Sequence, residues 1–211
     1  MEPGSPKFRR RKADRPNEIV EAALSVFVER GFAAARLDDI AARAGVSKGA
    51  IYLYFATKED IFRAVVDQAF SPSMEVMRDI VGAHPGPFPE LIRAIAAHMA
   101  GVVERTPLGG VAKMVIGEAR NLPELARIWR QEVVEPSLDA LAAAIQAAQG
   151  RGEVRAGDPR AFALQFAAPL IVGVIWRETF VPIGAPAFDM PTLVRQHADT
   201  FLRGVRPGEG P

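Results

Sequence analysis

LDDIAARAGVSKGAIYLYF, residues 37–55, sets the architecture of this 211-residue chain. Its apolar residues recur three and four positions apart, which predicts two short helices that share one small core. Gly45 is expected to end the first helix, because glycine adopts the left-handed conformation of a C-terminal cap without steric cost. Ser47 can cap the second helix with its hydroxyl group, and Ile51 returns that helix to the core. Small and apolar residues in this order are typical of a DNA-binding helix-turn-helix.

The segment TKEDIF, residues 57–62, continues the pattern, because Thr57 and Asp60 are spaced as a capping box for the next helix. Together, SKGAIYLYF and TKEDIF resemble the DNA-binding domain of TetR-type transcriptional repressors, over roughly residues 16–70. The resemblance implies an all-α fold, with an N-terminal three-helix helix-turn-helix domain and a C-terminal helical domain for ligand binding and dimerisation. The alternative is an ordinary helical hairpin inside an unrelated bundle.

The resemblance also implies which residues meet DNA. The start of the second motif helix would enter the major groove, where backbone amides and the helix dipole also favour phosphate. Tyrosine hydroxyls would donate to phosphate oxygens, and Lys58 matches the family's lysine that pairs with the DNA backbone. For Tyr54, core packing is an equally good interpretation. The predicted DNA-binding residues are Arg36, Ser47, Lys48, Gly49, Ala50, Tyr52, Tyr54 and Lys58.

One position departs from the family pattern. The family usually has a small hydroxyl residue before the first motif helix, where it caps that helix and contacts phosphate. This chain has Ala35 and Arg36 at that place. Arg36 is long enough to reach a phosphate, but neither side chain is expected to cap the helix.

Turn and capping signals divide the chain into five segments. Pro16 suits the first turn of a helix, and HPGPFP, residues 84–89, marks a break. We expect one connecting helix from Thr57 to about Val81, bent at Pro72. The five segments are a basic flexible arm (1–15), the helix-turn-helix domain (16–56), the connecting helix (57–82), the helical ligand-binding and dimerisation domain (83–206) and a tail (207–211).

The second domain contains no stretch with strand periodicity, so we expect helices throughout. Leu122 to about Gln149 predicts one long helix with a kink at Pro136. Residues 162–181 are strongly apolar, and Met190 to Val205 predicts a final amphipathic helix. The longest uncharged stretch, residues 161–176, is shorter than the roughly 20 residues that a membrane helix needs, so a buried helix is favoured.

The net charge of +1 is unevenly distributed. Residues 1–58 carry eleven Lys and Arg against seven Asp and Glu, and the remaining residues carry a balance of −3. The positive excess therefore travels with the helix-turn-helix, where attraction to phosphate is useful. We favour contact of the basic arm with phosphate or the minor groove over a merely solubilising role.

A short recognition helix makes too few contacts for selective binding by one copy, so we expect a homodimer on a palindromic site. The predicted interface is formed by the last two helices, as a four-helix bundle across a twofold axis. Ala167, Ala168 and Gly173 would allow close approach there. The final helix would add the apolar residues Met190, Val194, Phe201 and Val205. The alternative is a fully intramolecular core.

The resemblance implies a pocket for a small hydrophobic effector, whose binding would release the repressor from DNA. For Glu118, pairing with Arg120 or Arg93 is the competing interpretation, and for His98 it is an ordinary hydrogen bond. Each apolar candidate is individually better explained as core. The predicted lining residues are His98, Met99, Met114, Glu118, Trp129 and Phe166.

Composition and missing motifs exclude several other functions. The chain has no cysteine and three histidines, so we expect neither disulfides nor a metal site, and no cofactor. The sequence contains no glycine-rich phosphate-binding loop and no nucleophile motif, so we do not expect an enzyme. No secretory signal is evident, which favours the cytoplasm. A DNA-binding regulator without a ligand and an activator stay open as alternatives.

Overall fold

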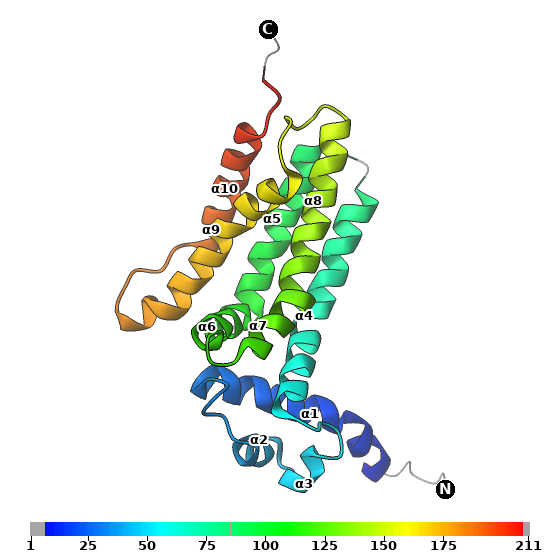
Figure 1. The fold of residues 1–211 in the computed structure, drawn as a ribbon, viewed down its shortest axis with the longest axis vertical. Helices are drawn as coiled ribbons and strands as arrows, with labels where there is room; N and C mark the ends of the chain where they lie inside the picture. Colours follow the sequence, from blue (N-terminus) through cyan, green and yellow to red (C-terminus); the bar gives the residue numbers. More distant parts are fainter. Residues whose placement is uncertain (1–6, 85, 209–211) are drawn as a thin grey trace, which may run out of the picture.

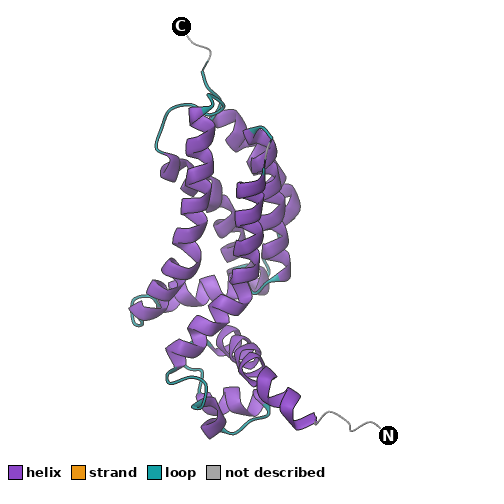
Figure 2. Ribbon diagram, turned by 90° about the vertical axis from the view of Figure 1, so that its right-hand side faces the viewer, coloured by secondary structure: helices purple, strands orange, loops and turns teal. Residues whose placement is uncertain are grey.

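The computed structural model describes residues 7–84 and 86–208 and contains only helices and loops within them. A small lobe holds the first three helices, and a larger helical bundle rises above it (Figure 1). The helices are α1 (Lys7–Arg30), α2 (Leu37–Ala44), α3 (Lys48–Ile51), α4 (Lys58–Ala83), α5 (Phe88–Arg105), α6 (Leu108–Glu118), α7 (Pro123–Trp129), α8 (Glu135–Gly150), α9 (Pro159–Thr179) and α10 (Met190–Gly204). The predicted all-α fold is confirmed, as the colouring by secondary structure shows (Figure 2).

The turn between α2 and α3 forms as its sequence predicts. Gly45 adopts the left-handed conformation, with φ of 67°, and its N–H bonds back to the end of α2. The N–H of Val46 donates to the carbonyl of Ala41 at 3.0 Å. The hydroxyl of Ser47 accepts from the N–H of Ala50 at 3.2 Å and so caps α3. The backbone bonds of Gly45 and Val46 close the end of α2, and the Ser47 hydroxyl begins α3 directly after the turn.

The start of α1 differs from the prediction. We expected the helix to begin at Pro16 after a flexible arm, but α1 begins at Lys7 and contains Pro16 in its interior. The lysines, arginines and alanine before Pro16 are good helix formers, and the helix continues through the proline although one backbone donor is missing there. Residues 1–6 of the predicted arm, like residues 209–211 of the tail, lie outside the described residues.

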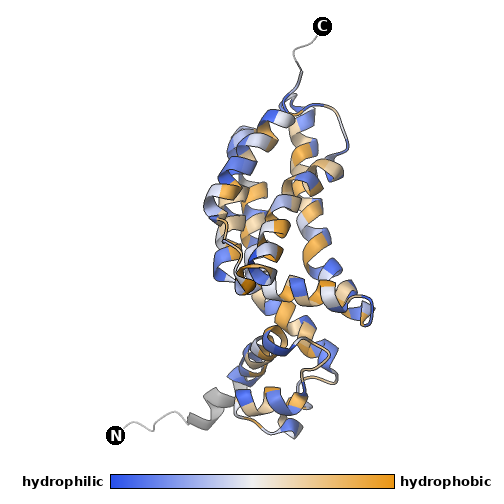
Figure 3. Ribbon diagram, turned by 90° about the vertical axis from the view of Figure 1, so that its left-hand side faces the viewer, coloured by the Kyte–Doolittle hydropathy of each residue, from blue (hydrophilic) through white to orange (hydrophobic). Residues whose placement is uncertain are grey.

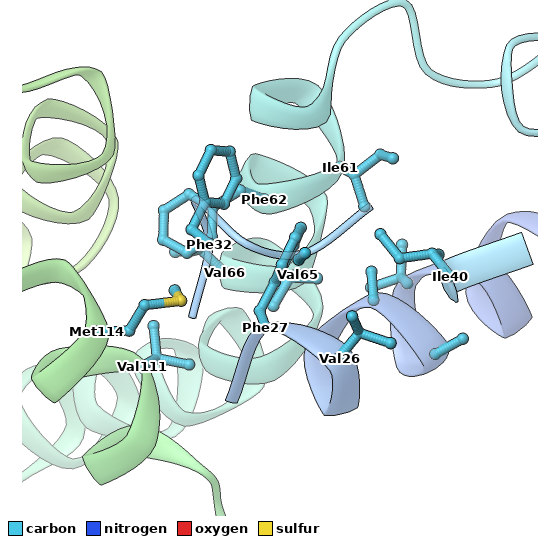
Figure 4. Close-up of a cluster of buried hydrophobic side chains, with 14 of the residues drawn as sticks. Val26, Phe27, Phe32, Ile40, Ile61, Phe62, Val65, Val66, Val111 and Met114 are labelled. Carbon is cyan, nitrogen blue, oxygen red and sulfur yellow. The ribbon is translucent and has the colours of Figure 1, made fainter. Parts of the chain in front are cut away.

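Helix α4 links the two lobes of the molecule. Thr57 and Asp60 form the predicted capping box at its start, and Pro72 lies within it. Its first half packs in one core with α1, α2, α3, α6 and α7, while Met77, Ile80 and Val81 reach a second core. The rings of Phe27, Phe32 and Phe62 form an aromatic cluster in the first core. Val111 and Met114 of α6 belong to the same core (Figure 4).

The long helix predicted over residues 122–149 is present, since the chain is helical without a break from Pro123 to Gly150, and it contains an irregular turn next to Pro136. A π-helical turn, Arg130–Val134, separates α7 from α8. The N–H of Glu135 bonds to the carbonyl of Arg130, five residues earlier, and Pro136 follows directly. Because a proline lacks an N–H, the ladder of bonds is already broken there, and the extra residue of the π turn is accommodated at that point.

The apolar face of the final helix, which was predicted to lie in a dimer interface, faces the interior of the protomer instead. Met190, Val194, Phe201 and Val205, expected in a dimer interface, are buried within the protomer. Three of these four residues pack in the second core with α5, α8 and α9. Gly173 is also buried, and a Cβ there would lie 3.0 Å from the Met190 methyl, so its small size serves the contact between α9 and α10. Apolar periodicity identifies a buried face, but not which chain covers it.

Candidate nucleic-acid interface

The amino end of α3 lies at the exposed tip of the small lobe (Figure 1). Ser47, Lys48 and Gly49 are exposed, and Ala50 is half-buried. Tyr52 follows directly after the helix with 53% of its surface exposed. The residues predicted to enter the major groove therefore form one accessible edge, and Ile51 anchors that edge in the first core.

The two tyrosines occupy different environments. Tyr54 is partly buried and packs against the first core, which agrees with the core-packing interpretation. Tyr52 is exposed beside Leu53, which has 80% of its surface exposed. Of the two tyrosines, Tyr52 is thus the more accessible to a duplex.

The cations of this lobe are extensively paired with acidic side chains. The ammonium of Lys48 lies 3.1 Å from a carboxylate oxygen of Asp38. Arg43 donates two hydrogen bonds to Glu29, at 2.5 and 2.8 Å, and these bonds lower the pKa of the Glu29 carboxyl. The guanidinium of Arg30 is 2.7 Å from Asp39.

Arg36 occupies the N-cap position of α2 without forming a side-chain cap, as its departure from the family pattern suggested. It is exposed, and within the described part of the chain no acidic side chain pairs with it. A phosphate contact by Arg36 stays a prediction.

Lys58 points into the protein. Its ammonium donates to the carbonyls of Phe32 and Ala35, at 2.6 and 3.0 Å, and lies 4.4 Å from the centre of the Phe32 ring. Burial lowers the pKa of this ammonium. In this conformation Lys58 holds the loop between α1 and α2, and its predicted contact with the DNA backbone stays a prediction.

Glu118 has a role that sequence reasoning missed. Its two carboxylate oxygens accept from the N–H of Ala33, at 2.9 and 3.2 Å, rather than pairing with Arg120 or Arg93. Gly31, with φ of 77°, passes so close that a Cβ there would lie 2.8 Å from a Glu118 oxygen. The end of α6 is therefore bonded to the same loop that Lys58 holds. No local pattern predicts a contact between residues 85 positions apart.

Two adjacent glycines let α6 approach its neighbours closely. A Cβ at Gly109 would lie 2.6 Å from Glu178 of α9, and one at Gly110 would lie 2.9 Å from Val28 of α1. The ammonium of Lys113 also donates to the carbonyl of Glu178 at 2.6 Å. Helix α6 thus joins α9 on one side to the small lobe on the other.

The other predicted effector-site residues are not gathered in one cavity. Met114 and Trp129 belong to the first core, whereas Met99 and Phe166 belong to the second. A ring nitrogen of His98 lies 3.0 Å from the carbonyl of Ser73, which is the ordinary hydrogen bond that we considered.

A groove of about 560 Å³ lies between α5 and α10, and none of the six predicted residues lines it. Its volume is within the range of small-molecule sites. Alanines of both helices and Gly101 line it together with charged residues, a composition that sequence alone does not distinguish from an ordinary helix surface. The lining residues are Arg93, Ala96, Ala97, Ala100, Gly101, Glu104, Arg105, Pro191, Val194, Arg195, Ala198 and Asp199.

Helix α9 leaves an apolar face uncovered. Leu164, Ile171 and Val172 are exposed, and so are Phe180, Ile183 and Phe188 in the segment after the helix. By length and composition, Pro159–Ile183 would suffice to span a membrane, but its other face packs against α6, α8 and α10. Figure 3 shows apolar and polar residues mixed along the helices of the bundle. We therefore interpret the uncovered residues as a contact surface.

An exposed helix-turn-helix joined by a long helix to a separate helical bundle is the arrangement of a DNA-binding regulator. Residues 19–65 match the model of bacterial regulatory proteins of the tetR family, and residues 90–204 match the C-terminal domain of AefR-like transcriptional repressors. The chain belongs to the TetR family of transcriptional regulators.

Individual relatives agree with this assignment. The HTH-type transcriptional repressor BepR of Brucella suis is 40% identical over 94 residues, which are 43% of this chain and 45% of BepR. A TetR-family regulator from Mesorhizobium loti superposes with a TM-score of 0.74 at 24% identity, covering 92% of this chain and 96% of that one. FadR of Bacillus subtilis, solved with stearoyl-CoA, gives 0.71 at 22% identity, covering 90% and 99%. These two structures establish the shared fold.

Replacing Glu118 with alanine tests the bond between α6 and the small lobe. Because a charged acceptor is removed from the N–H of Ala33, we expect the free energy of unfolding to fall by about 1–2 kcal/mol. Urea denaturation followed by circular dichroism measures this change. Glu75, an exposed residue of α4, supplies the control Glu75→Ala, which should leave stability within about 0.5 kcal/mol of the wild type. Equal stability of all three proteins would contradict a structural role for Glu118.

Proposed function

We propose that this chain is a ligand-responsive repressor that binds a palindromic operator as a homodimer and is released by a small hydrophobic effector. The observation that carries the proposal is the exposed amino end of α3, with Ser47, Lys48, Gly49 and Tyr52 on one accessible edge. The relative BepR is described as a repressor, which favours repression over activation. Such a regulator acts in the cytoplasm, on chromosomal DNA.

Dimerisation follows from the small size of the reading element. Helix α3 has four residues, so one copy makes few base contacts. Two copies on successive major grooves, ~34 Å apart, double the number of contacts and explain a palindromic site. The uncovered apolar face of α9 supplies the contact surface for the second copy. Exposed residues of α10, such as Arg195, Gln196 and Thr200, are polar and would form the rim of that interface.

The effector would act through the helical bundle on the small lobe. Coupling of ~1–3 kcal/mol between two sites is enough for a useful switch. Helix α4 spans both lobes, and α6 is bonded to the loop before α2, so both could carry such coupling. His98, Met99, Met114, Glu118, Trp129 and Phe166 remain the proposed effector residues, although they lie in two cores and a junction rather than in one cavity.

Tyr52→Ala tests the assignment of the reading edge. We expect operator affinity to fall at least about tenfold, because one phosphate hydrogen bond and a ring contact are lost from each of two heads. The probe is the duplex that the wild-type protein enriches from a random-sequence library, and affinity is measured by fluorescence anisotropy. Leu53→Ala, which changes the adjacent exposed side chain, is the matched control and should have a smaller effect. Unchanged affinity of the Tyr52 variant would refute the assignment.

Val172→Glu tests the dimer interface. A carboxylate at the centre of the uncovered face of α9 would be buried without a partner in the dimer, so we expect the protein to become monomeric. Light scattering coupled to size exclusion measures the mass, and circular dichroism reports the fold. The control Ala143→Glu places the same carboxylate on the exposed side of α8 and should remain dimeric. A dimeric Val172 variant would move the interface elsewhere.

A panel of amphipathic compounds tests the effector hypothesis. FadR of Bacillus subtilis was solved with stearoyl-CoA, so the panel includes long-chain acyl-CoA thioesters beside planar aromatic compounds. We expect at least one class to raise the melting temperature and to weaken operator binding, since an effector stabilises the DNA-free conformation. If no compound does either, the regulator without a ligand is favoured. If a compound strengthens operator binding instead, release by an effector is refuted.

A further inference from the structure

We propose that Asp38 is a specificity-determining residue, which keeps the ammonium of Lys48 from binding phosphate at sites other than the operator. The inference rests on the proposed function, because it requires α3 to meet a duplex. Lys48 is the first residue of α3, and Asp38 is the second residue of α2. Their 3.1 Å contact ties the amino end of the recognition helix to a carboxylate from the neighbouring helix.

The pair lies on the surface that must approach DNA. The side chain of Lys48 is 48% exposed and that of Asp38 is 65% exposed. Exposed ion pairs are weak, so an acceptor on a correctly placed duplex can take Lys48 from its partner. At a wrong site, Lys48 leaves Asp38 without a replacement partner for the carboxylate. Binding there is weakened, because the unpaired carboxylate lies close to the phosphates and is repelled by them.

The charge of the whole small lobe points to the same conclusion. Residues 14–58 carry six cations and six anions, so their net charge is zero. The excess of +4 found over residues 1–58 lies entirely within the first twelve residues. Arg30, Arg43 and Lys48 are paired with carboxylates, and Lys58 is bonded to carbonyls. Apart from Arg36, which pairs with no acidic side chain of the described residues, general attraction to phosphate around α3 is therefore reduced, and binding depends on exchanging these pairs for contacts of the right geometry.

A carboxylate can distinguish bases as well as repel phosphates. An aspartate is an acceptor only, and on a duplex it can accept from the amino group of cytosine. At the operator, a cytosine amino group would replace Lys48 as the partner of the Asp38 carboxylate, or the carboxylate would lie away from the phosphates. At an unrelated sequence, the carboxylate would have no new donor and would lie close to the phosphates. Discrimination then arises from the penalty at the wrong site more than from a gain at the right one.

Asp38→Asn tests the proposal, because asparagine keeps the shape of the side chain and removes its charge. We expect affinity for a scrambled duplex of equal length and composition to rise about three- to tenfold, while affinity for the enriched duplex changes less than about twofold. The ratio of the two affinities should therefore fall. The dependence of log affinity on log salt for the scrambled duplex should steepen by roughly one charge per head.

Two further variants separate this role from a general charge effect. Asp139→Asn removes the same charge from an exposed pair with Arg160 in the larger lobe, and should leave the affinity ratio unchanged. In a Lys48→Ala background, Asp38→Asn should lower the ratio less, because no ammonium remains to be released and only the repulsion between the carboxylate itself and the phosphates is removed.

The outcomes distinguish this inference from the proposed function. Equal affinity ratios for the wild type and Asp38→Asn would overturn the inference alone. So would a fall in the ratio that is as large with Lys48→Ala as without it, because Asp38 would then act independently of Lys48. A wild-type protein that enriches no duplex at all would overturn the proposed function together with this inference.

Discussion

The loop of residues 31–35 is the constraint on which the arrangement of the two lobes depends. The ammonium of Lys58 donates hydrogen bonds to the carbonyls of Phe32 and Ala35. The carboxylate of Glu118 accepts a hydrogen bond from the N–H of Ala33. Opposite charges therefore hold the acceptor and donor groups of one short piece of backbone. Because this loop leads directly into α2, its position sets where the recognition helix lies relative to the bundle.

Much of the fold follows from local physical rules. The caps at Ser47 and Thr57, the left-handed Gly45 and the break before α5 each depend on residues within four positions of one another, so the sequence predicts them. The amphipathic periods likewise identify the helices. The predicted start of α1 at Pro16 is wrong, because the helix-forming residues before the proline belong to the same helix.

In the candidate site, too, the sequence predicts the local features but not the contacts between distant residues. The exposed edge of α3 was predicted because a helix-turn-helix is a local motif. The bonds of Lys58 and Glu118, the pairing of Lys48 with Asp38 and the groove between α5 and α10 join residues that only the tertiary fold brings together. The burial of the α10 apolar stripe shows the same limit, since periodicity marks a face without naming its neighbour.

The consecutive glycines of α6 restrict how that helix can turn about its own axis. Successive residues of an α-helix point about 100° apart, and here one glycine faces Glu178 while the next faces Val28. A twist that widens the gap to α9 therefore alters the gap to α1 at the same time. Because both gaps are too narrow for a methyl group, a displacement of α9 toward α6 would be expected to press α6 against α1.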